Sequence, residues 1–182
     1  TSAEKVEQEV IIVDQASKFP LLARVLQESP GTALVFSRTK HGAKKICRVL
    51  NQTGYQTAEI HANRSQNQRR EALEGFKSGK YRVLVATDIA SRGIDVSHIE
   101  LVINFDLPDN LEDYVHRIGR TGRAGRAGRA ISFATPNQKQ DIRGIERIIR
   151  KTLKIVSQSP MAPLELPGGR ILEVRDEAPR RR

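Results

Sequence analysis

Residues 32–36 read T-A-L-V-F, and this short apolar run decides how the chain can fold. A run that is almost continuously apolar, rather than apolar at alternate positions, is typical of a strand buried on both faces. Two further apolar runs, R-V-L-V-A-T at residues 82–87 and E-L-V-I-N-F at residues 100–105, indicate two more strands. These three runs predict a mainly parallel sheet at the centre of the molecule, because such strands occur where helices cover both faces.

Working outward from these strands, apolar residues recur at helical spacing in the segments between them. We expect helices around residues 19–26, 43–50, 69–76 and 138–153, and further strands at residues 10–13, 57–61 and 130–134, the last being the final strand of the sheet. Strands that alternate with helices imply right-handed crossover connections. The predicted fold class is therefore a three-layer α/β/α domain with a mainly parallel sheet. In such sheets, ligands bind beyond the carboxyl ends of the strands.

The helical and strand patterns end near residue 155. We expect residues 1–155 to form one domain and residues 156–182, which contain Pro, Gly and Arg, to form a tail or linker. Residues 171–174 could add one short strand. The chain begins with Thr1 rather than Met, as expected of a piece of a longer protein.

The composition is strongly basic, with 31 Lys and Arg residues against 21 Asp and Glu residues and a net charge of +10. This excess favours a polyanionic partner such as nucleic acid. No apolar stretch reaches the ~20 residues of a membrane span. The single cysteine, Cys47, lies on an apolar helix face and predicts a buried thiol in a reducing compartment. The four histidines show no metal-ligand spacing, so no metal site is expected.

The segment from His116 to Arg129 reads H-R-I-G-R-T-G-R-A-G-R-A-G-R, with arginine at every third position. The planar guanidinium matches phosphate oxygens, and glycines let the backbone approach a ligand closely. A collagen-like repeat is excluded because the run contains no proline. A flexible arginine–glycine tail is a second alternative, since such tails are common in RNA-binding proteins. Apolar residues on both sides of the run instead place it inside a folded domain as a phosphate site.

The arginines of this run cannot all face one ligand. A helical turn holds ~3.6 residues, so arginines at every third position sweep around a helix. Only the first two or three can address the same ligand. We expect Arg126 and Arg129 to form a solvated extension that leads into the last strand.

Four motifs occur in order along the chain: L-V-F-S-R-T-K at 34–40, Q-x-x-R at 66–69, V-A-T-D-I-A-S-R-G-I-D at 85–95 and H-R-I-G-R-T-G-R at 116–123. Together they resemble the C-terminal RecA-like domain of a DEAD-box ATP-dependent RNA helicase, over roughly residues 6–153. The segment H-A-N-R-S-Q at 61–66 is most similar to the bacterial RhlE-type branch, in which glycine usually stands at the place of Ala62.

The resemblance implies a set of residues that act on ATP in a cleft between two RecA-like domains. Arg120 and Arg123 are expected to be arginine fingers that reach the γ-phosphate, and His116 to bridge to the partner domain near the attacking water. Asp95, after Gly93, is expected to accept a ribose hydroxyl. The structural alternatives are an arginine paired inside its own domain, a packed half-buried histidine, and a loop turn at Asp95.

The resemblance also implies a surface for RNA. Protein contacts to the RNA backbone position a strand without reading its base sequence. Internal struts that orient neighbouring loops are the alternative for Arg69 and Arg92. The positions that match the RNA-holding residues of the family are Thr39, Gln66, Arg69, Thr87 and Arg92.

Other parts of an ATP site are missing from the sequence. No G-x-x-x-x-G-K-S/T phosphate loop is present, and residues 176–179, D-E-A-P, match the family's D-E-A-D only by coincidence. ATP and Mg²⁺ are therefore expected to be held mainly by an N-terminal RecA-like domain of the same full-length protein, and this chain alone is expected to be inactive. The expected location is the cytoplasm. The alternatives are a non-catalytic RNA-binding or scaffolding domain, or a DNA-directed superfamily 2 helicase domain.

Overall fold

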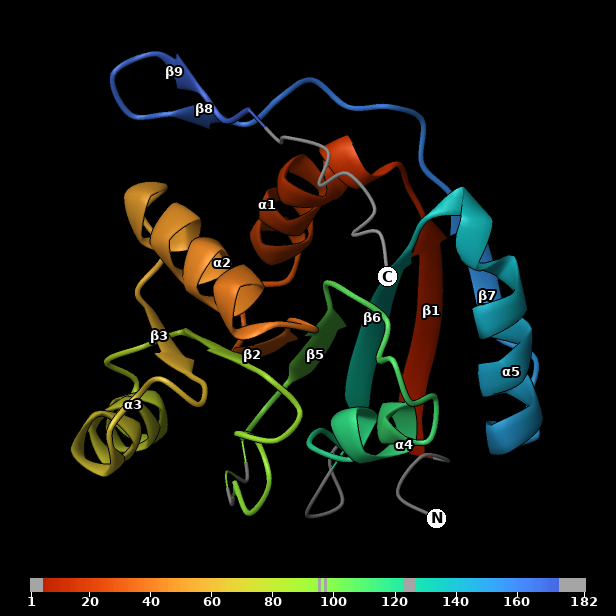
Figure 1. The fold of residues 1–182 in the computed structure, drawn as a ribbon, viewed down its shortest axis with the longest axis horizontal. Helices are drawn as coiled ribbons and strands as arrows, with labels where there is room; N and C mark the ends of the chain where they lie inside the picture. Colours follow the sequence, from red (N-terminus) through yellow and green to blue (C-terminus); the bar gives the residue numbers. More distant parts are fainter. Residues whose placement is uncertain (1–4, 95, 97, 123–126, 174–182) are drawn as a thin grey trace, which may run out of the picture.

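A seven-stranded sheet forms the centre of the molecule (Figure 1). The computed structural model describes residues 5–94, 96, 98–122 and 127–173. The strand order is β3-β4-β2-β5-β6-β1-β7, and every pair of neighbouring strands is parallel. The strands are β1 (Val6–Ile12), β2 (Ala33–Phe36), β3 (Thr57–Ile60), β4 (Val83–Ala86), β5 (Leu101–Asn104), β6 (Gly128–Ala134) and β7 (Lys154–Ser157).

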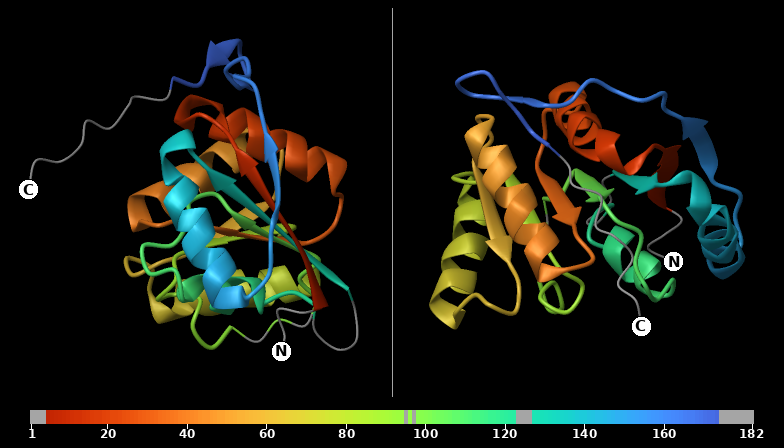
Figure 2. Two further views of the ribbon diagram at one scale, coloured as in Figure 1. Left: turned by 90° about the vertical axis from the view of Figure 1, so that its right-hand side faces the viewer. Right: turned by 45° about the horizontal axis from the view of Figure 1, so that its top comes forward.

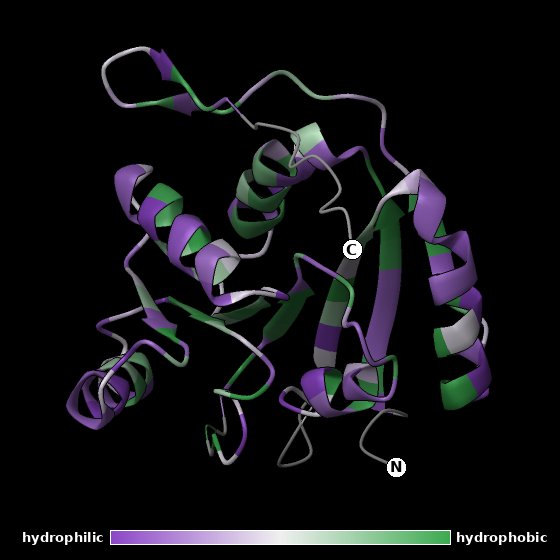
Figure 3. Ribbon diagram, in the orientation of Figure 1, coloured by the Kyte–Doolittle hydropathy of each residue, from purple (hydrophilic) through white to green (hydrophobic). Residues whose placement is uncertain are grey.

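Helices cover both faces of this sheet, which confirms the predicted three-layer fold class. The helices are α1 (Lys18–Glu28), α2 (Lys40–Gln52), α3 (Gln66–Ser78), α4 (Asp113–Ile118) and α5 (Lys139–Ile149). Short 3-10 turns, Gln15–Ser17 and Pro136–Gln138, precede α1 and α5. Figure 2 shows α5 and α1 on opposite sides of the sheet, and Figure 3 shows that the helices contain both hydrophilic and hydrophobic residues.

The core divides into two clusters because neighbouring residues of a strand project to opposite faces. Leu34 and Phe36 of β2 pack with residues of α3, α4 and α5. Ala33 and Val35 of the same strand pack with residues of α1 and α2. All four side chains are fully buried, which explains why the sequence of this strand is apolar throughout.

The structure corrects two sequence predictions at the C-terminal side of the sheet. The final strand is β7, not residues 130–134, and it pairs with β1. Residue 155, near which we expected the domain to end, lies within this strand. The last helix ends at Ile149, earlier than predicted, because Arg150 adopts a left-handed conformation with φ 54°. Its short length and exposed side chains made β7 hard to recognise as a strand.

The segment after β7 crosses the layer of α1 and α2 (Figure 2). Met161 N donates to Ser17 Oγ at 2.9 Å, just before α1 begins. Strands β8 (Glu165–Leu166) and β9 (Arg170–Ile171) then form a small antiparallel hairpin. Apolar side chains of this segment, Met161, Leu164, Leu166 and Leu172, pack against the cluster beneath α1 and α2. Residues 158–172 are therefore attached to the domain by packing.

Candidate nucleotide and nucleic-acid interface

A buried arginine connects the loop after β4 to helix α4. Arg117 is 1 % exposed, and its Nε and Nη2 donate to Oδ1 and Oδ2 of Asp88 at 2.5 and 2.6 Å. Its Nη1 donates to the carbonyl of Asp106 at 2.6 Å and to Oδ1 of Asn104 at 3.2 Å. The guanidinium also lies 5.0 Å from the ring centre of Phe36. These contacts hold α4 at the carboxyl ends of β2, β4 and β5.

Sequence reasoning did not assign this role to Arg117. Arg117 belongs to the series of arginines at every third position, and that regular spacing indicated a phosphate site rather than an internal ion pair. The signal that could have found it is its place on α4, because Tyr114 and Ile118 lie on the same helix face and both are fully buried. An arginine on a buried face needs partners inside the domain.

Tyr114 attaches the same helix to β1. Its hydroxyl donates to Oε1 of Gln8 at 2.7 Å, and burial raises the pKa of the phenol. Tyr114 and Arg117 therefore fix α4 from two sides, and the segment that follows the helix leaves from a defined position.

Of the residues expected to act on the nucleotide, the structure describes His116, Arg120 and Gly93. His116 is exposed in the last turn of α4, so it is not the packed, half-buried histidine that was the alternative. Arg120 Nη1 donates to the carbonyl of Ile94 at 3.0 Å. Gly93 makes a turn with φ 74°, a conformation that favours glycine. The arginine series and the loop after β4 therefore meet at Arg120 and Ile94.

Three residues of the sequence interpretation, Asp95, Arg123 and Arg126, lie outside the described residues. Arg129 is exposed, as expected, but it lies inside β6 and pairs with Leu101 of β5 rather than in an extension before the strand. Its Nη1 donates to Ser29 Oγ at 3.2 Å. Gly128, which has no side chain, packs closely against the backbone of Gly122.

A second group of predicted residues lines a pocket of about 550 Å³ at the carboxyl ends of β3 and β4. Gln66, Arg69 and Thr87 are brought together there. The other charged residues of the lining, to which the sequence interpretation gave no individual role, are Arg38, Lys40, Arg64, Asp88, Asp109 and Asp113. The three basic ones follow β2 and β3 directly, a position that marks ligand-binding loops in parallel sheets.

Arg69 also acts as an internal strut. Its Nη1 donates to the carbonyl of Ala90, and its Nη2 donates to the carbonyl of Arg92 at 3.1 Å. The side chain of Arg92 itself is exposed. Arg69 therefore holds the loop that follows β4 and lines the pocket with the rest of its side chain.

Two helix starts position the remaining polar residues. Thr39 caps α2, because its Oγ1 accepts from the backbone N–H of Gly42 at 3.0 Å. Ser65 and Gln68 form a reciprocal capping box at the start of α3, where Gln66 lies. Thr39 is exposed between the pocket residues Arg38 and Lys40. The first turns of both helices are thus presented at one edge of the sheet.

The described residues include no group of three or more His, Cys, Asp or Glu side chains that could hold a metal ion. Within the same residues, every helix is too short or too polar to cross a membrane.

Residues 17–125 match the helicase conserved C-terminal domain. This match spans more than half of the chain, and the chain therefore belongs to that family, as the C-terminal helicase domain of the DEAD-box type. It is 43 % identical over 153 residues to the DEAD-box ATP-dependent RNA helicase CshA of Bacillus subtilis. That alignment covers 84 % of this chain and 31 % of CshA, so the chain spans about a third of this relative.

Two solved structures show the same fold. A DEAD box protein from the hyperthermophile Methanococcus jannaschii is 40 % identical, with a TM-score of 0.79 over 86 % of this chain and 43 % of that one. Saccharomyces cerevisiae Dbp5 bound to RNA and ADP BeF3 is 28 % identical, with a TM-score of 0.77 over 84 % of this chain and 42 % of that one. Both likenesses confirm the RecA-like architecture that the sequence motifs predicted.

Proposed function

We propose that this chain is the second RecA-like domain of an ATP-dependent RNA helicase and completes an ATP site that another domain begins. The observation that carries the proposal is the hydrogen bond from Arg120 Nη1 to the carbonyl of Ile94 at 3.0 Å. It joins the two motifs to which nucleotide contacts are assigned. The likeness to Dbp5 bound to RNA and ADP BeF3 supports the same reading.

Arg120 and Arg123 act as arginine fingers in this proposal. A guanidinium beside the γ-phosphate stabilises the charge that develops as the phosphoryl group is transferred, an effect of ~10³–10⁵ in rate in GTPases. Arg120 has to exchange its bond to Ile94 for a phosphate oxygen when the two domains close. His116, exposed at the end of α4, contacts the partner domain, and Asp95 after Gly93 accepts a ribose hydroxyl.

RNA lies over the pocket at the ends of β3 and β4. Arg38, Lys40 and Arg64 add positive charge around Gln66 and Thr87, and phosphate contacts of this kind do not depend on base sequence. Thr39 and Arg92 are exposed beside the pocket and extend this surface. Domain closure around ATP and RNA bends one strand, so that a short duplex separates locally, and hydrolysis then resets the affinity.

The absence of a phosphate loop from this sequence assigns ATP and its Mg²⁺ mainly to the N-terminal RecA-like domain. We therefore propose that the isolated chain does not hydrolyse ATP. The proposal includes a cytoplasmic location. The RhlE-type branch rests on the segment from His61 to Gln66 alone.

The proposal is tested by joining this chain to a first RecA-like domain that carries the phosphate loop and the D-E-A-D sequence. RNA-stimulated ATP hydrolysis is then measured for Arg120→Ala and Arg123→Ala, with Arg126→Ala from the same run as the matched control. Both finger variants should lose about 10³-fold or more in kcat, and the control should keep its rate. Unchanged hydrolysis in Arg123→Ala would remove the finger assignment.

A non-catalytic RNA-binding domain is the second candidate, and the presence of Arg38, Lys40 and Arg64 in the pocket around Gln66 is the observation that favours it. The same joined protein separates the two candidates. A binding module keeps its RNA affinity but shows no RNA-stimulated ATPase activity. A DNA-directed helicase domain would instead be stimulated equally by single-stranded DNA.

A further inference from the structure

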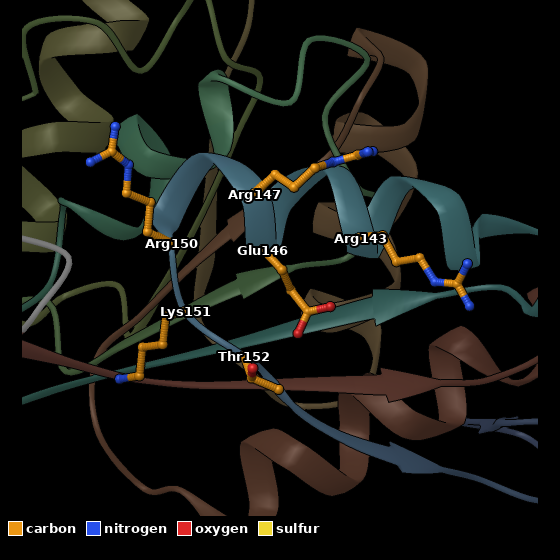
Figure 4. A pocket seen from close by; sticks show the side chains of 6 residues that line it. All are labelled: Arg143, Glu146, Arg147, Arg150, Lys151 and Thr152. Carbon is orange, nitrogen blue, oxygen red and sulfur yellow. The ribbon is translucent and has the colours of Figure 1, made fainter.

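A second basic site lies at the opposite edge of the sheet from the pocket described above. We use the name α5 groove for a depression of about 530 Å³ lined by Arg143, Glu146, Arg147, Arg150, Lys151 and Thr152. Figure 4 shows the side chains of Arg143 and Glu146 descending from α5, and Lys151 and Thr152 on the turn that leads into β7. The proposed nucleotide and RNA residues contribute nothing to its lining.

The positive charges of the α5 groove are not neutralised inside the domain. Arg143, Arg147, Arg150 and Lys151 are exposed, and none of them has an ion-pair partner among the described residues. The carboxylate of Glu146 is already engaged, because its Oε2 accepts from the backbone N–H of Leu153 at 2.8 Å. The helix dipole stabilises cations in the last turn of a helix, but Arg143 lies almost two turns before the end of α5. The dipole therefore does not explain the presence of Arg143. The groove therefore offers several cations to an anionic partner.

Arg150 occupies a position where the backbone favours glycine. It follows the last residue of α5 in the left-handed conformation, and it is the only non-glycine residue with positive φ in the described part of the chain. At the end of α3 the corresponding position is Gly79, with φ 85°. A side chain kept at a strained position suggests a use for that side chain. Here the side chain supplies a cation to the groove.

The groove continues into a strand edge that can accept another strand. β7 pairs with β1 on one side, and no described strand lies on its other side. All four of its residues are exposed, including Ile155 at 44 % and Val156 at 36 %. Backbone N–H and C=O groups along such an edge are a template for an added strand.

The register of the sheet determines which side of an added strand meets the arginines. Ile155 is paired with Val10, which packs in the same cluster as Ile142 and Ile145 of α5. Ile155 therefore projects to the face that α5 covers, and Val156 projects to the other face. On an added strand, every second side chain would lie on the α5 face near Arg143, and the alternate side chains would lie beside Val156.

We propose that the α5 groove and the edge of β7 bind an extended acidic segment of a partner protein, which adds a strand to the sheet. Acidic side chains on the α5 face pair with Arg143, Arg147 and Arg150, and apolar side chains on the other face cover Val156. An RNA backbone fits the observations less well, because it cannot pair with the backbone N–H and C=O groups of the free edge of β7. This inference does not depend on the proposed helicase function.

The test uses the 182-residue chain and a short fluorescein-labelled peptide of alternating glutamate and valine, with a lysine–valine peptide as the probe control. Binding is followed by fluorescence anisotropy and by hydrogen exchange of the backbone amides of β7. We expect the acidic peptide to bind and to slow exchange in β7. The variant Arg143→Gln/Arg147→Gln should weaken binding about tenfold, whereas Lys44→Gln/Arg48→Gln, two exposed cations of α2, should leave it unchanged.

A second variant separates the role of Arg150 from damage to the fold. Arg150→Gly should raise the urea midpoint of unfolding, because glycine is favoured at this helix end, and yet weaken peptide binding. Absence of peptide binding at millimolar concentrations, or binding without slower exchange in β7, would overturn the proposal. If duplex RNA displaces the peptide and itself depends on Arg143 and Arg147, the groove is a nucleic-acid site and the proposal is also overturned.

Discussion

Arg117 donates two parallel hydrogen bonds to the carboxylate of Asp88, at 2.5 and 2.6 Å, across a separation of 29 residues in the sequence. The pair attaches the loop after β4 to helix α4 and so sets the starting point of the segment that contains Arg120. A finger arginine can meet a phosphate only if the elements that carry it are held in place.

Removing the guanidinium of Arg117 should destabilise the folded domain. We expect Arg117→Ala to lower the free energy of unfolding by about 3–5 kcal/mol, because Asp88 loses its partner in a largely buried site. Arg117→Lys should recover only part of this loss, since an ammonium cannot make the paired bonds. Urea denaturation measures the change, with Arg129→Ala as the control. If Arg117→Ala unfolds at the same urea concentration as the parent chain, the pair does not support the fold.

The two predicted RNA residues Arg69 and Gln66 should behave differently. Arg69→Ala loses the two bonds to the loop carbonyls of Ala90 and Arg92, so it should lower both RNA affinity and stability, the latter by ~1.5–3 kcal/mol. Gln66→Ala should lower RNA affinity and leave the urea midpoint unchanged. Binding of a single-stranded RNA and urea unfolding are measured on both variants. Equal stability of the two variants would show that Arg69 is not a strut.

RNA binding by the isolated chain should be weak and depend on salt. The pocket cations Arg38, Lys40 and Arg64 release counterions from the RNA, so the logarithm of the binding constant should fall linearly with the logarithm of salt concentration. Each cation that contacts a phosphate contributes about 0.7 to this slope on single strands. Arg64→Gln should reduce the slope. A salt-independent constant, or strong preference for one base sequence, would contradict a phosphate-binding surface.

Gly128 should not tolerate a side chain. A Cβ atom there would lie 2.4 Å from the backbone N of Gly122 and 2.5 Å from Thr121 Oγ1. We expect Gly128→Ala to cost about 1–3 kcal/mol of unfolding free energy through overpacking. Ala127→Ser, at the exposed neighbouring position, is the control for thermal unfolding measurements. A melting temperature of Gly128→Ala equal to that of the control would show that Thr121 and Gly122 can move away from residue 128 at little cost.

The thiol of Cys47 should be inert in the folded chain. Burial raises its pKa from 9.0 to about 12, with a smaller contribution from the nearby carboxylate of Glu59. Alkylation by iodoacetamide at pH 8 should therefore be slow until urea unfolds the chain. Fast labelling of the native protein would contradict the buried position.

The raised pKa of Cys47 also predicts how the free energy of unfolding changes with pH. Below pH 9 the thiol is protonated in both the folded and the unfolded chain, so its contribution to the free energy of unfolding is fully present. Between pH 9 and about 12 only the unfolded chain ionises at this group, and the contribution is lost as the pH rises. Cys47→Ala should lose less stability than the parent chain over this interval. Parallel stability curves for the two proteins would argue against the raised pKa.

The sequence by itself determined the layered fold and the family. The runs at residues 32–36 and 82–87 are apolar because both faces of their strands are covered, and that cause is visible locally as an uninterrupted apolar pattern. The motifs that follow β3 and β4 were recognisable because the loops after parallel strands lie together at the carboxyl ends of the strands, where ligands bind. Three of the predicted RNA residues indeed line one pocket.

Only the tertiary structure decided the partner of Arg117, the strut formed by Arg69 and the position of β7. An arginine has the same appearance in a sequence whether its fork holds Asp88 or faces a phosphate, because the choice depends on atoms that are distant along the chain. β7 is short and exposed, so it lacks the apolar pattern, and its place is set by backbone hydrogen bonds to β1. Side-chain periodicity reports burial, whereas these features depend on hydrogen bonds formed after the strands have assembled.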